Sequence, residues 1–202
     1  AQYDSPKGDY FPADGDSEAL RAITGKIEKD IGETRKLPLK AQLEHMRQSL
    51  DCFFDEVDKS AVFQTINEPD VKGEWAIAPG VDQSRRLLYI HGGAFHVGSP
   101  KSHRVITSRL SEIANCAVLA VDYRLMPENK RFDGIKDCRN AYDWMLNHGP
   151  MGANSNVKAI FIAGDSAGGN LTLSLLSWIR DTQRQAVNAA VAISPVTDMQ
   201  LL

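Results

Sequence analysis

The sequence has 202 residues, of which 43% are hydrophobic and 24% are charged. These proportions are those of an ordinary globular protein, and they exclude disorder as a general description of the chain. The 23 Lys and Arg residues and 26 Asp and Glu residues give a net charge of −3, without any basic run. Nucleic acids and anionic membrane surfaces are therefore not expected as partners.

The longest unbroken apolar runs, at residues 116–121 and 159–163, are far shorter than the ~20 residues of a transmembrane helix. No membrane span is predicted. Residues 1–16 contain no apolar core of a signal peptide, so we expect such a peptide to be absent or already removed. The predicted location is cytoplasmic, with secretion after cleavage of a signal as the alternative. The three cysteines form no CxxC or Cys/His cluster, which indicates reduced thiols rather than a disulfide framework or a zinc site.

Two amphipathic helices are predicted before any strand. The first covers residues 17–32, and the second begins after Pro38 and carries an apolar stripe as far as residues 53–54. Short β-prone segments follow at residues 61–67 and 73–79.

From residue 87 onward, short apolar runs alternate with amphipathic helices. The runs cover residues 87–90, 117–121, 159–163 and 189–193, and the helices lie around residues 102–114, 133–148 and 167–180. Strands that are buried on both faces and joined by helical crossovers indicate a parallel α/β sheet. We therefore predict a helical segment, residues 1–55, followed by an α/β core, residues 56–202.

The strongest local signal surrounds Ser166. Gly164-x-Ser166-x-Gly168 directly follows an apolar run and directly precedes a predicted helix, which is the context of a nucleophile elbow. The turn forces the serine into a strained backbone conformation, and side chains two positions away would collide with it. The amide of Ala167 then lies at a helix N-terminus, where it can face an oxyanion. A glycine-rich packing turn and an anion-binding loop of the flavodoxin type are the alternatives.

A second signal is the segment His91-Gly92-Gly93-Ala94-Phe95, which follows the apolar run 87–90. Successive small residues after a strand can present bare N–H groups to a pocket, as the second half of an oxyanion hole does. For His91, a structural role within this loop is preferred over that of a base, because His91 precedes Ser166 in the chain.

Three motifs together resemble those of the hormone-sensitive-lipase-like family of α/β-hydrolases, whose members are carboxylesterases and lipases. They are HGGAF at residues 91–95, DYRLMPE at residues 122–128 and GDSAGGN at residues 164–170. The resemblance implies the α/β-hydrolase fold, a mostly parallel sheet with flanking helices, in which the two leading helices form an N-terminal cap over the acyl pocket. Residues 122–124 are expected to be structural, in a buried ion pair or a hydrogen-bond network beside the elbow.

Carried over to this chain, the resemblance makes Ser166 the catalytic nucleophile and Gly92, Gly93, Ala94 and Ala167 the oxyanion-hole residues. The donors it implies are the backbone amides of Gly93, Ala94 and Ala167, while His91 and Asp165 are supporting residues. Ala94 stands where glycine is commonest in the family. An amide donor tolerates this change if the backbone angles are allowed.

The partners of the serine are not found. An α/β-hydrolase places its Asp or Glu and its His after the nucleophile, yet all five histidines of this chain precede Ser166. We therefore expect a chain truncated after the sixth strand, inactive by itself, in which the run 189–193 lies at an unprotected edge of the sheet. The complete enzyme would hydrolyse carboxylic esters of short to medium acyl length through an acyl-enzyme on Ser166, with the acid and histidine in a C-terminal segment.

One alternative is a non-catalytic ligand-binding or receptor module on a degenerate hydrolase fold. Another is that a second chain supplies the acid and the histidine. No metal and no organic cofactor is implied. The expected partner is a small-molecule ester, and the sequence leaves a homo-oligomer open.

Overall fold

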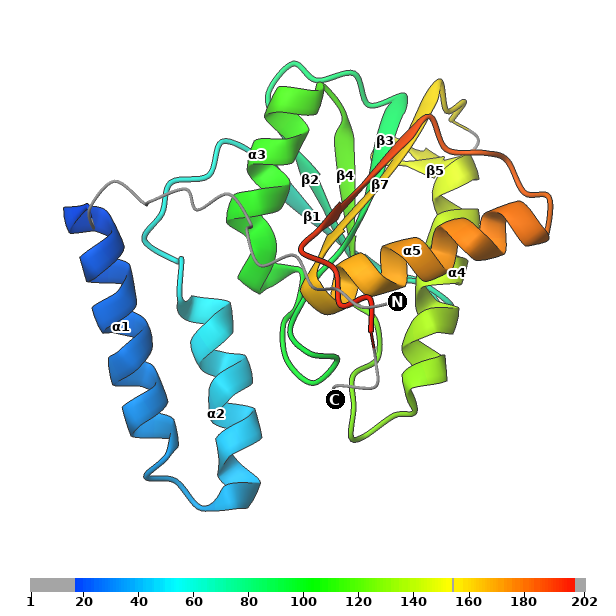
Figure 1. The fold of residues 1–202 in the computed structure, drawn as a ribbon. Helices are drawn as coiled ribbons and strands as arrows, with labels where there is room; N and C mark the ends of the chain where they lie inside the picture. Colours follow the sequence, from blue (N-terminus) through cyan, green and yellow to red (C-terminus); the bar gives the residue numbers. More distant parts are fainter. Residues whose placement is uncertain (1–16, 154, 199–202) are drawn as a thin grey trace, which may run out of the picture. The chain divides into compact units, whose positions relative to one another are not determined.

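The computed structural model describes residues 17–153 and 155–198 (Figure 1). The chain divides into two compact units, and the boundary in sequence falls between residues 42 and 43. Helix α1 (Glu18–Thr34) belongs to the first unit. Ser17 caps this helix, because its hydroxyl accepts a hydrogen bond from the Leu20 amide at 3.1 Å. Helix α2 (Leu39–Cys52) begins in the first unit and ends in the second. Both leading helices are confirmed, and the cap role of residues 1–55 stays a prediction.

A six-stranded sheet forms the centre of the second unit, with the strand order β1-β2-β4-β3-β7-β8. Its strands are β1 (Val62–Asn67), β2 (Lys72–Ile77), β3 (Arg85–Ile90), β4 (Ala117–Val121), β7 (Ala159–Asp165) and β8 (Ala189–Ile193). The four strands from β4 to β8 are parallel, whereas β2 is antiparallel to both of its neighbours. The turn between β1 and β2 is too short for a crossover, so these strands form a hairpin.

Helices cover both faces of the sheet (Figure 1). Helix α3 (Arg104–Ala114), which follows the short helix η1 (Lys101–His103), packs on one face. Helices α4 (Arg131–Asn147) and α5 (Ser166–Asp181) pack on the other. Each face of the sheet carries its own hydrophobic core. Along β3, Leu87 and Tyr89 belong to the core under α3, and Leu88 and Ile90 belong to the core under α4 and α5. Side chains alternate along a strand, so strands buried on both sides appear in the sequence as continuous apolar runs. The predicted α/β architecture is confirmed.

Strand β8 lies at the edge of the sheet and is mostly exposed, with Val191 56% and Ile193 42% accessible. A sheet that ends at its sixth strand is expected to leave the run 189–193 at an unprotected edge, and the described chain confirms this expectation. A two-stranded hairpin, β5 (His148–Gly149) with β6 (Gly152–Ala153), was not predicted.

Arg86 shows why β3 begins earlier than its apolar run indicates. Its side chain is fully buried, and its guanidinium donates hydrogen bonds to the carbonyl oxygens of Met145 (2.6 Å) and Ser155 (2.8 Å). Burial lowers the pKa of this guanidinium below its usual value. A charged residue inside the strand thus secures the end of α4, a role that a hydropathy pattern does not reveal.

Candidate active site

Ser166 stands at the turn from β7 to α5, as the sequence predicts. Its φ is +51°, in the left-handed region that residues with a side chain seldom adopt. Gly168 permits this conformation, because a Cβ at that position would collide with the carbonyl oxygen of Ile90 at the end of β3. The sharp turn projects Ser166 beyond the carboxyl end of β7, and its side chain is half-buried.

The amide of Ala167 lies in the first turn of α5, where no helical carbonyl is available to it. The helix dipole adds partial positive charge at this end. An N–H group in this position can stabilise negative charge on an oxygen bound next to Ser166.

Residues 91–98, here called the glycine loop, follow β3 at the same edge of the sheet. Ile90 pairs with Gly164 in the parallel register, so the loop begins beside the elbow. Gly93, Ala94 and Phe95 all have positive φ, at +115°, +52° and +64°. No described residue accepts a hydrogen bond from the amides of Gly93 or Ala94. Both amides are therefore available to a ligand.

Asp165 connects the elbow to the glycine loop. Its Oδ1 atom accepts hydrogen bonds from the Gly92 amide at 3.0 Å and from the Tyr89 hydroxyl at 2.7 Å. The Nε2 atom of His103 lies 3.6 Å from the same oxygen. Burial alone would raise the pKa of Asp165, but the nearby His103 ring and the hydrogen bond from Tyr89 outweigh it, and the pKa is lowered. The amide of Gly92 is thus occupied, which separates it from those of Gly93 and Ala94.

His91 lies inside the loop, and the residue is 1% exposed. Its Nδ1 atom is 2.8 Å from the Gly92 carbonyl oxygen, and since a carbonyl only accepts, Nδ1 carries the proton. The ring stacks on Tyr123, whose hydroxyl donates to the His91 carbonyl oxygen at 2.9 Å. Burial lowers the pKa of His91 to about 3, with a further contribution from His103. This neutral, enclosed ring fits the structural role that the sequence favours.

The DYRLMPE segment differs in part from its prediction. Tyr123 forms the expected network beside the glycine loop. Arg124, however, pairs with Asp137 of α4 at 2.8 Å and keeps 47% of its side chain exposed. Of the two alternatives expected for residues 122–124, the hydrogen-bond network is present and the buried ion pair is not, because Arg124 pairs outside the motif with Asp137 of α4 and stays half-exposed.

No described residue forms a hydrogen bond with the hydroxyl of Ser166. His96 bonds the Ala94 carbonyl oxygen at 2.7 Å, His103 lies next to Asp165, and His148 stacks on Trp144. None of these rings takes the position of a base for Ser166. The described part of the chain thus brings the predicted nucleophile and the predicted oxyanion donors together, and no described residue bonds the serine hydroxyl.

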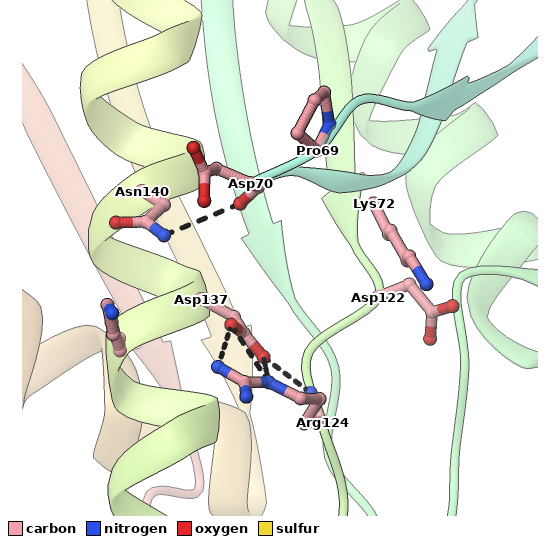
Figure 2. A pocket seen from close by; sticks show the side chains of 8 residues that line it. Pro69, Asp70, Lys72, Asp122, Arg124, Asp137 and Asn140 are labelled. Carbon is pink, nitrogen blue, oxygen red and sulfur yellow. Dashed lines mark hydrogen bonds and ion pairs between the residues drawn. The ribbon is translucent and has the colours of Figure 1, made fainter.

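A separate cavity of about 340 Å³ lies between the start of β2, the end of β4 and helix α4 (Figure 2). Its lining is polar and carries both signs of charge, from Lys72, Asp122, Arg124 and Asp137 among others. In Figure 2 the Arg124 guanidinium and the Asp137 carboxylate point toward each other and are joined by hydrogen bonds. Neither Ser166 nor the glycine loop lines this cavity, and its charged groups neutralise one another, so it is not the candidate active site.

Sequence reasoning missed Tyr89, His103 and Arg47. Tyr89 lies within an apolar run, and His103 lies at the start of a helix, so neither carries a local signal. Arg47 is 49 positions from the His96 carbonyl oxygen to which it donates.

Within residues 17–153 and 155–198, no group of three His, Cys, Asp or Glu side chains is placed to hold a metal ion. The same residues include no helix with the length and apolarity that a membrane span requires.

A family model described as the alpha/beta hydrolase fold matches residues 87–201, more than half of the chain. The carboxylesterase/phospholipase LipF of Mycobacterium tuberculosis is 39% identical over 146 residues, which are 70% of this chain and 37% of that protein. An acetyl-hydrolase of Streptomyces hygroscopicus is 40% identical over 127 residues, which are 62% of this chain and 40% of that protein.

The fold is similar to the crystal structure of an esterase from the bacterial hormone-sensitive lipase family, with a TM-score of 0.76 and 31% identity. The match covers 91% of this chain and 59% of that structure. The chain therefore spans less than half the length of both curated relatives and about three fifths of the solved structure.

Proposed function

We propose that this chain, which belongs to the α/β-hydrolase family, carries the nucleophile and the oxyanion hole of a serine carboxylesterase. The observation that carries the proposal is the conformation of Ser166. A serine held at φ +51° between a buried strand and a helix, beside a loop with two unoccupied amides, has the geometry that acyl transfer requires. A glycine-rich packing turn would not need the strained serine.

In the proposed reaction, Ser166 Oγ attacks the ester carbonyl carbon while a histidine takes the hydroxyl proton. The carbonyl oxygen becomes an oxyanion and accepts hydrogen bonds from the amides of Gly93, Ala94 and Ala167. The tetrahedral intermediate collapses, and the alcohol leaves with the proton from the histidine. Water then attacks the acyl-serine in the same manner and releases the carboxylic acid. We assign the histidine, and the Asp or Glu that orients it, to the part of the full-length protein that this chain does not span.

The proposed substrates are small carboxylic esters with short to medium acyl groups. The names of two relatives, an acetyl-hydrolase and a carboxylesterase/phospholipase, support carboxylic esters as the substrate class. The cytoplasmic location and the homo-oligomer stay predictions.

The test uses the full-length protein and p-nitrophenyl esters of increasing acyl length. We expect hydrolysis that is fastest with acetate or butyrate and that is lost in Ser166→Ala. Ser177→Ala is the matched control, because Ser177 is an exposed serine on the same helix whose hydroxyl donates to the Leu173 carbonyl oxygen. Hydrolysis that survives in Ser166→Ala would contradict the proposal.

A second candidate is a ligand-binding module on the same fold. It is favoured by one observation, that no described residue accepts the proton of the Ser166 hydroxyl. Saturable binding of an ester or its acid, without turnover by the full-length protein, would support this candidate against the enzyme.

A further inference from the structure

Arg47, in the second half of α2, contacts two loops of the same compact unit at once. Its Nε atom donates to the His96 carbonyl oxygen at 2.8 Å, and its Nη2 atom donates to the Met126 carbonyl oxygen at 3.0 Å. The remaining N–H groups form a bidentate pair with Glu128, at 3.0 Å and 2.9 Å. A single guanidinium therefore joins α2, the glycine loop and the segment after β4.

The Glu128 carboxylate fixes the plane of this guanidinium. The hydrogen bonds from Arg47 lower the pKa of Glu128 to about 2, so the pair stays ionised in the neutral range. With both carboxylate oxygens bound to Nη1 and Nη2, the Nε edge faces the backbone of the glycine loop. A lysine ammonium has no such planar set of donors and cannot make the same four bonds.

Of the two carbonyl groups that Arg47 binds, that of His96 directly follows the strained part of the glycine loop, and that of Met126 lies in the segment after β4. Three consecutive residues, 93–95, have positive φ. The Phe95 carbonyl oxygen accepts a hydrogen bond from the Met126 amide at 2.8 Å, so the loop and the segment after β4 are already joined there. Left-handed residues other than glycine persist only where surrounding contacts hold them. Arg47 supplies such contacts on both sides of the Phe95 to Met126 bond.

Helix α2 has a second attachment to the end of this loop region. The Ser99 hydroxyl donates to the Asp51 carboxylate, one helical turn after Arg47, at 2.5 Å. The position of Arg47 relative to the loop is therefore set from two points on one helix face.

We propose that Arg47 is a positioning residue for the glycine loop, which holds the amides of Gly93 and Ala94 where the oxyanion forms. This inference rests on the proposed function for its catalytic consequence, but the structural restraint is independent of it. It also assigns a role to Glu128 of the DYRLMPE motif, as the residue that orients Arg47.

Hydrogen exchange in the full-length protein tests the restraint without reference to catalysis. The reporters are the amides of Val97, bonded to the Gly93 carbonyl oxygen, and Met126, bonded to that of Phe95. We expect faster exchange at both amides in Arg47→Met and in Arg47→Lys. The matched control is Arg184→Met, because Arg184 also pairs through two nitrogens with a carboxylate, that of Asp143, beyond the far end of α5. Unchanged exchange at Val97 and Met126 in both Arg47 variants would overturn the inference.

Kinetics tests the catalytic consequence. Titration of the reactive serine with a stoichiometric phosphonate counts folded sites, so that kcat is measured per active serine. We expect kcat to fall about 10- to 100-fold in Arg47→Met, with KM within about twofold, and affinity for a trifluoromethyl ketone to fall in parallel with kcat. A lower serine titre with unchanged kcat per site would overturn the positioning role, as would a rise in KM alone. If the wild-type protein hydrolyses no ester, the proposed function fails, and the exchange measurement alone decides the inference.

Discussion

The Asp165 carboxylate accepts a hydrogen bond from the Gly92 amide at 3.0 Å, which joins the residue before the proposed nucleophile to the loop that holds the proposed oxyanion donors. The two halves of the site follow β3 and β7, which are neighbouring strands, although Gly92 and Asp165 lie 73 positions apart in sequence. Their relative position therefore depends on this contact as well as on the sheet.

We predict that Asp165→Ala lowers kcat/KM of the full-length protein about 100-fold, since small displacements of catalytic groups have effects of this size. The substitution also leaves the Gly92 amide and the Tyr89 hydroxyl without their acceptor, so the free energy of unfolding should fall by about 1–3 kcal/mol. Steady-state kinetics and guanidinium denaturation check both values. An unchanged kcat/KM would contradict the role of the contact.

Asp165→Asn removes the negative charge of the side chain and keeps its shape, so it tests the contribution of the charge to stability. The pKa of Asp165 is below its usual value of 3.8, because the hydrogen bonds that favour the ionised form outweigh its burial. A lowered pKa means that ionised Asp165 stabilises the fold above pH 3.8 and that this contribution is lost as the pH falls through the folded-state value. The wild type should thus be more stable than Asp165→Asn at neutral pH, and the difference should shrink below about pH 4. A difference that grows with acidity would be inconsistent with this assignment.

Ala94 has a left-handed backbone conformation, which glycine adopts more easily than alanine. Its φ of +52° is accessible to alanine only with strain, since a Cβ in the left-handed region costs about 1–2 kcal/mol. Replacing Ala94 with glycine would relieve this strain. The greater backbone entropy of glycine in the unfolded chain would offset part of the gain in stability. We predict that Ala94→Gly raises the free energy of unfolding by about 0.5–1 kcal/mol and keeps activity, because the donor is the backbone amide. Ala94→Val should destabilise instead, and equal stability of the three proteins would show that the loop is not strained.

His91 should make stability depend on pH. Its pKa in the folded protein is about 3, against an ordinary value of 6.5. Between these values the unfolded chain binds a proton that the folded protein excludes, so stability is complete above pH 6.5 and declines as the pH falls toward 3. One such proton gives a slope of up to about 1.4 kcal/mol per pH unit. His91→Asn, which keeps a donor for the Gly92 carbonyl oxygen, should show a smaller slope in denaturation measured from pH 4 to 7. An identical slope would mean that another group is responsible.

Gly168 and Gly25 form a matched pair of glycines in helices. A Cβ at Gly168 meets the backbone of Ile90, whereas a Cβ at Gly25 in α1 meets no atom within 4 Å. Gly168→Ala should therefore destabilise the protein by about 3 kcal/mol or prevent folding, as overpacking against rigid backbone does. Gly25→Ala should be neutral or stabilising by up to about 1 kcal/mol, because alanine is the better helix former. Thermal unfolding of both variants checks the contrast, and a well-folded, active Gly168→Ala would refute the close packing at the elbow.

Local patterns were sufficient for the six strands of the central sheet, for the α-helices and for the position of Ser166. The apolar runs of β4 and β8 coincide with their predicted bounds, and β4 is buried along its whole length, as an unbroken apolar stretch indicates. The elbow could be predicted because Gly164, Ser166 and Gly168 are close in sequence. Contacts that depend on distant segments could not be predicted in this way. Arg47 with Glu128, which lie 81 positions apart, is one such contact.

The central claim is that Ser166 is the residue that becomes acylated. The most direct measurement is peptide mass spectrometry of the full-length protein after reaction with an alkyl phosphonofluoridate, which traps an activated serine in covalent form. We predict one equivalent of phosphonate, located on the peptide that contains Ser166, and no label in Ser166→Ala. Labelling of a different residue, or no labelling of a folded protein that hydrolyses esters, would contradict the assignment of Ser166 as the nucleophile.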